Sequence, residues 1–356
     1  MRRKILLTGI LLGCYMAAFA ANPEVLRHTL YYRSVDQNGD SLTLSGAVSV
    51  PASKDAKGVI LVTHYTIAAK DEAPSVTPTS EAKYLAEDYV LLTPDYIGYG
   101  ATAERIHPYL HGELTATNCV DMLFAARPLL DTMDLDVSLD SIYLMGYSQG
   151  GASAIWTLKK LEEEYSDRVY VKHCFVGAGP YDVAETYDEA IRTNKVGSPL
   201  VIPMLVEGTN ESYNLGLDRS FFYTKAMERK YNKYIKDKEY GVVEIFFLTL
   251  NHRVSHWLTK EGMDKTLPMT RKLYGGLVRS SIVGEHVHYD WEPESNLYVF
   301  HSYKDDIVTF RCAEHLQQRY PERENITYDF GNYGSHLKAS GIFYSKVQQM
   351  LRELNP

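Results

Sequence analysis

The chain has 356 residues, of which 45% are hydrophobic, and a formal net charge of −8. This length suffices for one large domain, or for a domain that carries an insertion. The acidic balance, with no basic cluster, argues against nucleic acid and anionic membrane surfaces as partners.

Residues 1–20 are typical of a signal peptide that directs export. Residues 2–4 are basic, the stretch 5–19 carries no charge, and small residues precede Ala21 as they do at a cleavage site. We therefore expect a mature chain beginning at Ala21 and a secreted or periplasmic protein. A membrane anchor is disfavoured because the apolar stretch is short for a span. A lipoprotein site at Cys14 fits poorly, because apolar residues continue beyond it.

Three cysteines remain after this leader, Cys119, Cys174 and Cys312. They lie far apart, each within a predicted helix or strand, so they form no disulfide framework. Buried free thiols are favoured over a single bridge.

Strand-like and helix-like runs alternate along the first half of the mature chain. The strands 26–35 and 41–50 are joined by a hairpin turn of sequence Asp-Gln-Asn-Gly-Asp. Such alternation predicts a parallel sheet with helices on both faces. The elements that follow the hairpin are strand 59–63, helix 81–88 capped by Ser80, strand 89–93, helix 115–130, strand 142–145, helix 152–161 and strand 171–176.

The alternation stops at the segment 183–290, which is mostly helical in pattern and has amphipathic stretches at 221–234 and 242–257. We predict an α/β core formed by residues 21–182 and 291–356, with 183–290 inserted as a cap above the sheet. In the second part of the core the predicted elements are strand 297–300, helix 310–319, strand 326–330 and helix 338–354.

A serine in a glycine-rich turn lies between the strand 142–145 and the helix 152–161. The motif runs from Gly146 to Gly150 and has the form G-x-S-x-G. Alone it is weak, because composition produces it in about one chain in ten of this length. However, strand, tight turn and helix are the setting of a nucleophile elbow, whose helix N-terminus favours negative charge. The pattern favours Ser148 as a nucleophile over an ordinary glycine-rich turn.

A serine nucleophile needs a histidine to take its proton and a carboxylate to orient that histidine. Asp305 and Asp306 follow the strand that ends at Phe300, and His336 follows the last strand. Each is commonplace alone, but together they give the order serine, acid, histidine. We expect only one of the two adjacent acids to point at His336. We predict Asp305, which is nearer the strand end.

The whole mature chain resembles an α/β-hydrolase. Pro-Asp-Tyr-Ile-Gly-Tyr-Gly at 94–100 and His-Pro-Tyr at 107–109 are similar to the secretory lipase family and its bacterial esterase relatives, and Gly-Tyr-Ser-Gln-Gly-Gly at 146–151 suits that group. Asp305 also stands three residues before the apolar Val308, a spacing typical of the hydrolase family that the chain resembles. The resemblance implies a mostly parallel central sheet flanked by helices, with a mainly helical cap. It also implies three roles: nucleophile for Ser148, acid for Asp305 and base for His336.

An oxyanion hole requires two backbone N–H groups. Gln149, directly after the nucleophile, is expected to supply one of them. The second is expected from the loop His64-Tyr65-Thr66, which follows the strand 59–63. Relatives have His-Gly here, so both Tyr65 and Thr66 stay open as donors. We favour Tyr65, whose ring would narrow the acyl pocket.

Other histidines allow a metal site to be considered. His252 and His256 are spaced for one helix face, but they lack the glutamate of a zinc-protease helix. The run 285–290 holds two histidines and two acids, and a polar loop at the cap boundary explains it more simply than a cation site. We predict no cofactor and no metal.

The sequence thus predicts an exported carboxylesterase or lipase-like serine hydrolase that works through a Ser-His-Asp triad and an acyl-enzyme. Its partner would be a small-molecule ester, with lipids and acylated carbohydrates both open. The alternative is a serine peptidase of the aminopeptidase or acyl-peptidase type, because a triad does not distinguish esters from amides. A non-catalytic binding protein is less favoured. No motif indicates the acyl chain length or the oligomeric state.

Overall fold

The structure is a computed structural model that describes residues 24–355. The predicted signal peptide over 1–20, the cleavage site before Ala21 and the alternative lipid-attachment residue Cys14 lie outside the described residues. Within the described part, no helix is both long enough and apolar enough to cross a membrane.

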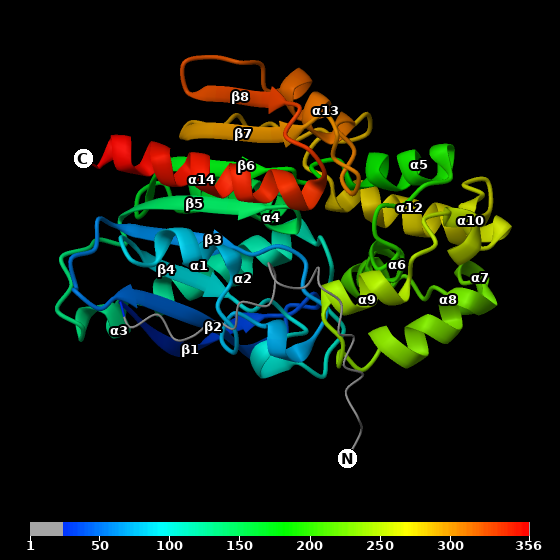
Figure 1. Ribbon diagram of the computed structural model, residues 1–356, viewed down its shortest axis with the longest axis horizontal. Coiled ribbons are helices and arrows are strands. Elements are labelled where there is room, and N and C mark those ends of the chain that lie inside the picture. Colours follow the sequence, from blue (N-terminus) through cyan, green and yellow to red (C-terminus); the bar gives the residue numbers. More distant parts are fainter. Residues whose placement is uncertain (1–23, 356) are drawn as a thin grey trace, which may run out of the picture.

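The described chain forms one eight-stranded sheet in the order β1-β2-β4-β3-β5-β6-β7-β8 (Figure 1). β2 pairs antiparallel with β1 and with β4, and all other neighbours run parallel. The strands are β1 (Val25–Val35), β2 (Ser41–Pro51), β3 (Val59–Thr63), β4 (Val90–Pro94), β5 (Ser141–Tyr147), β6 (Tyr170–Gly177), β7 (Asn296–Ser302) and β8 (Ile326–Gly331).

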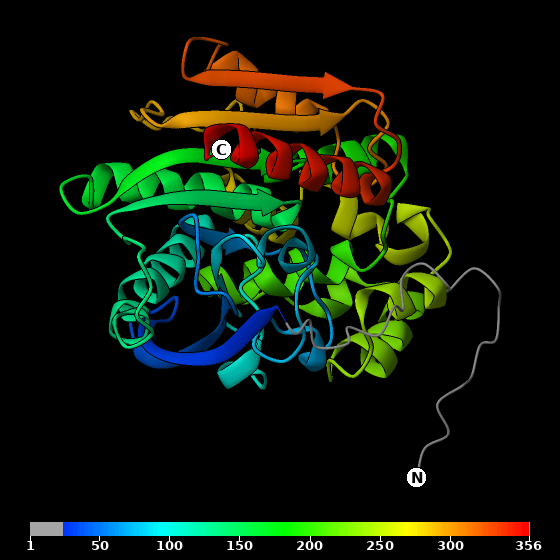
Figure 2. The same cartoon turned by 60° about the vertical axis from the view of Figure 1, so that its left-hand side comes forward.

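Helices cover both faces of the sheet, which explains the apolar runs of its central strands. All five residues of β3 and all five of β4 are buried, as expected where a parallel sheet has helices on each side. One face packs against α2, α4 and α13, and the other against α1 and α14 (Figures 1 and 2). The core helices are η2 (Lys70–Glu72), α1 (Ser80–Leu85), η3 (Gly100–Thr102), α2 (Gly112–Ala125), α3 (Arg127–Asp131), α4 (Gln149–Glu164), α13 (Arg311–Arg319) and α14 (His336–Leu354).

Two predicted core helices differ from the structure. The helix expected over 115–130 is two helices, α2 and α3, and Pro128 stands at the start of the second, where its missing N–H costs no helical hydrogen bond. Ser80 is the first helical residue of α1, and Thr79 occupies the N-cap position instead.

Between β6 and β7 the chain forms helices that lie at the edge where the parallel strands end (Figure 1). We call α5 to α12, residues 183–280, the helical insertion. Among the described residues it adds no strand to the sheet. Its helices are α5 (Val183–Thr193), α6 (Val201–Tyr213), α7 (Arg219–Phe222), α8 (Lys225–Lys230), η4 (Tyr231–Ile235), α9 (Val242–Leu248), α10 (Val254–Trp257), α11 (Lys260–Met263) and α12 (Pro268–Ser280).

The insertion is divided into shorter helices than its amphipathic pattern predicts. The stretch 221–234 is divided at Thr224, whose hydroxyl accepts from Met227 N–H and so begins a new helix. The stretch 242–257 is divided between α9 and α10, where the Asn251 side chain accepts from Arg253 N–H in an Asx turn.

The two ends of the insertion lie side by side. Tyr181 C=O accepts from the N–H groups of Ile282 at 2.9 Å and Val283 at 3.3 Å. Ser281 Oγ accepts from Val183 N–H at 2.9 Å. The insertion therefore leaves and rejoins the core at one hydrogen-bonded point.

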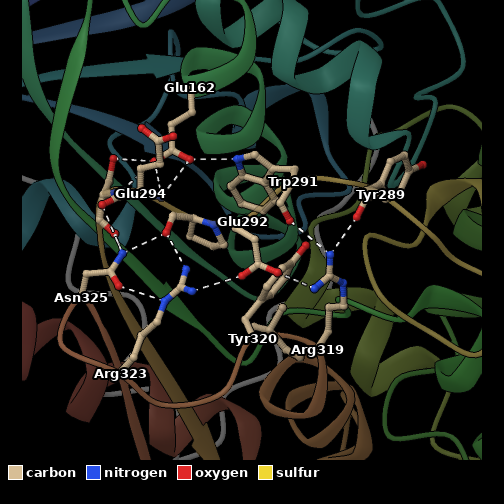
Figure 3. Close-up of polar contacts among 12 residues, drawn as sticks. Glu162, Tyr289, Trp291, Glu292, Glu294, Arg319, Tyr320, Arg323 and Asn325 are labelled. Carbon is tan, nitrogen blue, oxygen red and sulfur yellow. Dashed lines mark hydrogen bonds and ion pairs between the residues drawn. The ribbon is translucent and has the colours of Figure 1, made fainter.

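The segment that returns from the insertion to β7 is fixed to the core by charged groups (Figure 3). The Glu162 carboxylate on α4 accepts from Trp291 Nε1 at 2.8 Å and from Ser295 N–H at 2.8 Å. Glu292 pairs with Arg319 at 2.6 Å and with Arg323 at 3.2 Å. These bonds hold β7 in place after a long excursion of the chain.

The three described cysteines are free and buried, as predicted.

Candidate active site

Ser148 lies on a sharp turn between the end of β5 and the start of α4. Its backbone has φ 59° and ψ −125°, a conformation that costs energy for any residue except glycine. A Cβ on Gly146 would lie 2.1 Å from Gly150 O, and one on Gly150 would lie 1.9 Å from Thr63 O. Only glycine fits at these two positions, so the G-x-S-x-G spacing forms the tight strand-to-helix turn expected of it.

Ser148, His336 and Asp305 form one hydrogen-bonded row. His336 Nε2 lies 2.9 Å from Ser148 Oγ, and His336 Nδ1 lies 2.7 Å from Asp305 Oδ2. Because a carboxylate only accepts, Nδ1 carries the hydrogen and Nε2 presents its lone pair to the serine hydroxyl. The geometry permits a proton to pass from Ser148 Oγ to His336 Nε2, with the carboxylate beside the resulting imidazolium.

Backbone groups of its own loop hold the Asp305 carboxylate in place. Oδ1 accepts from the N–H groups of Ile307 at 2.9 Å and Val308 at 2.8 Å, which leaves Oδ2 for the histidine. Burial by itself would raise the pKa of Asp305, but the facing His336 ring and these hydrogen bonds bring that pKa below its ordinary value. The carboxyl is therefore ionised at neutral pH.

The expectation that only one acid contacts His336 is wrong. Asp306 Oδ1 accepts from His336 N–H at 3.0 Å, while Asp305 contacts the ring. Both contacts are possible because His336 is the first residue of α14, so its backbone N–H has no partner within the helix. The helix predicted over 338–354 begins two residues earlier in the structure, because α14 starts at His336.

The two predicted oxyanion residues lie at the start of α4 and in the loop that follows β3. Gln149 opens α4, so its N–H has no acceptor within the helix. Tyr65 follows β3 by two residues, and its ring packs with Ile67, Ala73 and Tyr99. Burial raises the pKa of its hydroxyl to about 12, which keeps the phenol neutral. Neighbouring Thr66 is held by a 2.8 Å hydrogen bond between its hydroxyl and that of Tyr109.

Two buried histidines beside the row were not assigned from the sequence. His301 Nε2 donates to Val308 O at 3.2 Å and lies 3.8 Å from Asp305 Oδ2. His107 Nε2 lies 2.7 Å from Gln149 Nε2. His107 stood out only as part of a motif shared with relatives, and no spacing indicated its partner. His301 gave no signal beyond its place directly after Phe300.

The histidines considered for a metal site are placed apart from this row. His252 precedes α10 and its Nδ1 lies 3.0 Å from Val196 O, whereas His256 is within α10, so the two do not share the predicted helix face. In the described part of the chain, no three His, Cys, Asp or Glu side chains are grouped so as to hold a metal ion. The run 285–290 has no helix or strand.

Comparisons with known proteins bear on the fold. No protein-family model matches the chain. A local stretch of 106 residues is 29% identical to DNA polymerase IV of Protochlamydia amoebophila, and this match spans 30% of the chain and 29% of the polymerase. So short a match transfers no activity.

Two similar solved structures match nearly the whole chain. One is the rice cell wall degrading esterase LipA from Xanthomonas oryzae, at a TM-score of 0.72 and 19% identity, covering 92% of this chain and 89% of that one. The other is Candida antarctica lipase A in its closed state, at a TM-score of 0.68 and 18% identity, covering 93% and 79%. Both are hydrolases of the α/β type. The protein therefore has the α/β-hydrolase fold.

Proposed function

We propose that this protein is an exported serine hydrolase that cleaves carboxylic esters through an acyl-enzyme. The observation that carries the proposal is the row of Ser148, His336 and Asp305, joined by hydrogen bonds of 2.9 and 2.7 Å. Export rests on the signal-peptide pattern of residues 1–20. The similarity to solved esterases and lipases supports hydrolysis as the reaction class.

In the proposed reaction Ser148 Oγ attacks the ester carbonyl carbon while its proton passes to His336 Nε2. The Asp305 carboxylate stabilises the imidazolium that forms. The tetrahedral intermediate collapses, the C–O bond breaks, and the alcohol leaves with the proton from His336. Water then attacks the acyl-enzyme, with His336 again as the base, and the carboxylic acid is released.

The negative charge on the attacked carbonyl oxygen needs donors that are in place beforehand. We assign Gln149 N–H as one of them. The second comes from the loop after β3, with Tyr65 N–H as our choice over Thr66. The positive end of the α4 dipole lies behind Ser148 and favours the same charge.

We assign the segment 183–290 as a cap that selects substrates. Tyr109 and Leu110 of the core, and Ala152 in the first turns of α4, belong to the same buried apolar cluster as side chains of the helical insertion. A Cβ on Gly208 of α6 would lie 2.5 Å from Tyr109 Cβ, so the insertion sits directly on this loop. The insertion therefore packs against the first turns of α4, close to Ser148, and we expect it to contact the bound ester.

Ser148→Ala tests the proposal. Loss of the nucleophile should reduce ester turnover by about a million-fold, because the triad works as a unit. Purified protein beginning at Ala21 is assayed on short and long acyl esters and on sugar-linked acetyl and feruloyl esters. Labelling by a fluorophosphonate is measured in parallel, with exposed Ser166→Ala as the matched control. Retention of more than a few per cent of activity by Ser148→Ala would overturn the assignment.

Esters and amides are distinguished by a second pair of substrates. The same acyl group is presented as an ester and as an aminoacyl amide, and kcat/KM is compared. Faster amide cleavage would identify a serine peptidase. Labelling without turnover on either substrate would contradict the proposed reaction.

A further inference from the structure

The side chain of Gln149 is buried and directed at His107. Gln149 is 1% exposed and His107 5% exposed, and their Nε2 atoms are 2.7 Å apart. The direction of this bond follows from the other ring nitrogen. His107 Nδ1 lies 2.7 Å from Ile97 O, and because a carbonyl only accepts, Nδ1 carries the hydrogen. His107 Nε2 is then a lone pair, and Gln149 Nε2–H donates to it.

His107 is suited to act as a permanent acceptor. Burial lowers the pKa of its ring to about 3, although the Ile97 carbonyl acts in the opposite direction. The imidazole therefore stays neutral under ordinary conditions. A neutral ring with a fixed tautomer keeps one lone pair aimed at Gln149 throughout the reaction.

The position of His107 is itself fixed from several sides. Its ring lies parallel to that of Tyr96, with centroids 5.9 Å apart and an interplanar angle of 5°. Tyr99 and Tyr109 contact it at centroid distances of 5.3 and 5.8 Å. Its backbone is also packed closely, because a Cβ on Gly98, at φ 92°, would lie 2.7 Å from His107 Cα.

The same aromatic group also contacts the loop that follows β3. Tyr96 stacks on His64 at 4.1 Å, and His64 Nδ1 donates to Tyr65 O at 2.6 Å. Tyr109 holds Thr66 through the hydroxyl bond described above. His107 is thus at the centre of an aromatic group that contacts both segments assigned to the oxyanion hole.

We propose that His107 is a positioning residue, which holds the Gln149 N–H in place through the buried Gln149 side chain. The proposal rests on the proposed function, since it concerns the oxyanion hole of that reaction. An oxyanion donor is effective at about 2.7–3.1 Å from the position of the charged oxygen, and that charge develops only in the transition state. Loss of the acceptor at residue 107 should therefore lower kcat and leave KM nearly unchanged.

Two substitutions of His107 by side chains of similar length test the role of this hydrogen-bond acceptor. In His107→Gln the side-chain Oε1 lies near the position of the ring Nε2 and can accept from Gln149, whereas His107→Met has similar length and no comparable acceptor. We expect His107→Met to lose roughly 10- to 100-fold in kcat with KM within about twofold, because a displaced donor is almost as costly as a missing one. His107→Gln should keep kcat within roughly threefold of the wild type.

Affinity for a boronic acid reads out the oxyanion site separately from turnover. The boronate is tetrahedral and mimics the intermediate, so its affinity should fall in parallel with kcat in His107→Met and be restored in His107→Gln. His173→Met, a half-buried histidine on β6, serves as the matched control and should leave both values unchanged. Thermal unfolding and circular dichroism show whether each variant is folded.

If His107→Met does not fold, Gln149→Met removes the same bond from its other partner and should show the same loss in kcat. Unchanged kcat in whichever of these two variants folds, equal losses in His107→Met and His107→Gln, or a change confined to KM would overturn the role of His107. A wild-type protein that neither turns over esters nor reacts with fluorophosphonate would refute the proposed function and this inference with it. Wild-type turnover with an unaffected His107→Met would refute the inference alone.

Discussion

Asp305 and Asp306 are adjacent residues that contact different groups of the same histidine. The first accepts from the His336 ring at 2.7 Å and the second from the His336 backbone N–H at 3.0 Å. Asp305 is enclosed by its own loop, whereas Asp306 is exposed. The contact with the ring orients the group that would take the proton from Ser148. The contact with the backbone N–H satisfies a donor in the first turn of α14.

Asp305→Asn and Asp306→Asn should therefore differ greatly in turnover. An amide at 305 can no longer hold the correct tautomer of His336, a role worth about 10⁴-fold in serine proteases. Asparagine at 306 can still accept from the backbone, so its rate should be near normal. Both variants are compared on one short ester. A collapse in Asp306→Asn with a normal rate in Asp305→Asn would show that the acid is the other neighbour.

The sequence predicted the members of the row because each follows a recognisable strand. Ser148 stands in a motif, and Asp305 and His336 come after the last two strands in the required order. His107 could not be predicted in the same way. Its partner Gln149 is 42 residues away, and only the folded chain brings them together. The second oxyanion donor remained open because Tyr65 departs from the residue of relatives.

At the scale of elements, strands were predicted more closely than helices. The buried run Val59–Thr63 is a strand with the predicted limits, because five consecutive apolar or β-branched residues fit a doubly covered sheet. Helix ends depend on individual side chains. Thr249 Oγ1 bonds back to Ile245 O, and Asn251 starts a turn, so α9 ends where hydrophobic periodicity alone would continue it.

The short helix α1 carries a buried acid beneath the loop of Tyr65. Glu81 is fully buried, and its Oε1 accepts from Tyr344 Oη at 3.1 Å. Its Oε2 has no hydrogen-bond partner in the described part of the chain. Burial raises the pKa of Glu81 to about 7, although its own backbone N–H, Thr79 and Tyr344 all act against the shift. The protonated form therefore fits this site better than the carboxylate.

This acid should make folding stability depend on pH. The folded state holds the proton more tightly than the unfolded chain, so the free energy of unfolding should fall as pH rises from about 4.5 to about 7 and then level off. Glu81→Gln removes the cost of ionising a buried carboxyl, because glutamine does not titrate. Its stability relative to the wild type should increase over this window by an amount on the order of 3 kcal/mol at most.

Urea unfolding at pH 4.5 and pH 8 would measure this effect, with exposed Glu285→Gln as the control. Because only the difference between variant and wild type is compared, other titrating groups cancel. A difference that stays constant between the two pH values would show that folding does not raise the pKa of Glu81.

At the scale of the whole molecule, the helical insertion can be replaced without stretching the core. Its ends meet where Tyr181 C=O accepts from Ile282 N–H at 2.9 Å, so a linker of a few residues can join Asp182 to Ser281. We expect the shortened protein to keep its fluorophosphonate labelling, because Ser148, His336 and Asp305 all belong to the core. Its ratio of kcat/KM for long and short acyl esters should change by about tenfold or more, since pocket contacts of a few methylenes are worth that much.

The measurement is the ester panel run on both proteins, with circular dichroism as the check on folding. An unchanged acyl preference in a folded, labelled protein would contradict the role of the insertion in substrate choice.

The place of the insertion in the chain also sets an order of assembly. Ser148 is made before the insertion, whereas Asp305 and His336 come after it. The pairing of Gly177 with Phe300 must close a loop of more than a hundred residues. Such long-range contacts form slowly, because the chain loses the entropy of loop closure before the new contacts stabilise it. We therefore expect strands β1 to β6 to associate early, and β7, β8 and α14 to dock late. In the proposed enzyme Ser148 would then gain its base only in the last steps of folding, so we expect a chain stalled midway to be inactive toward esters.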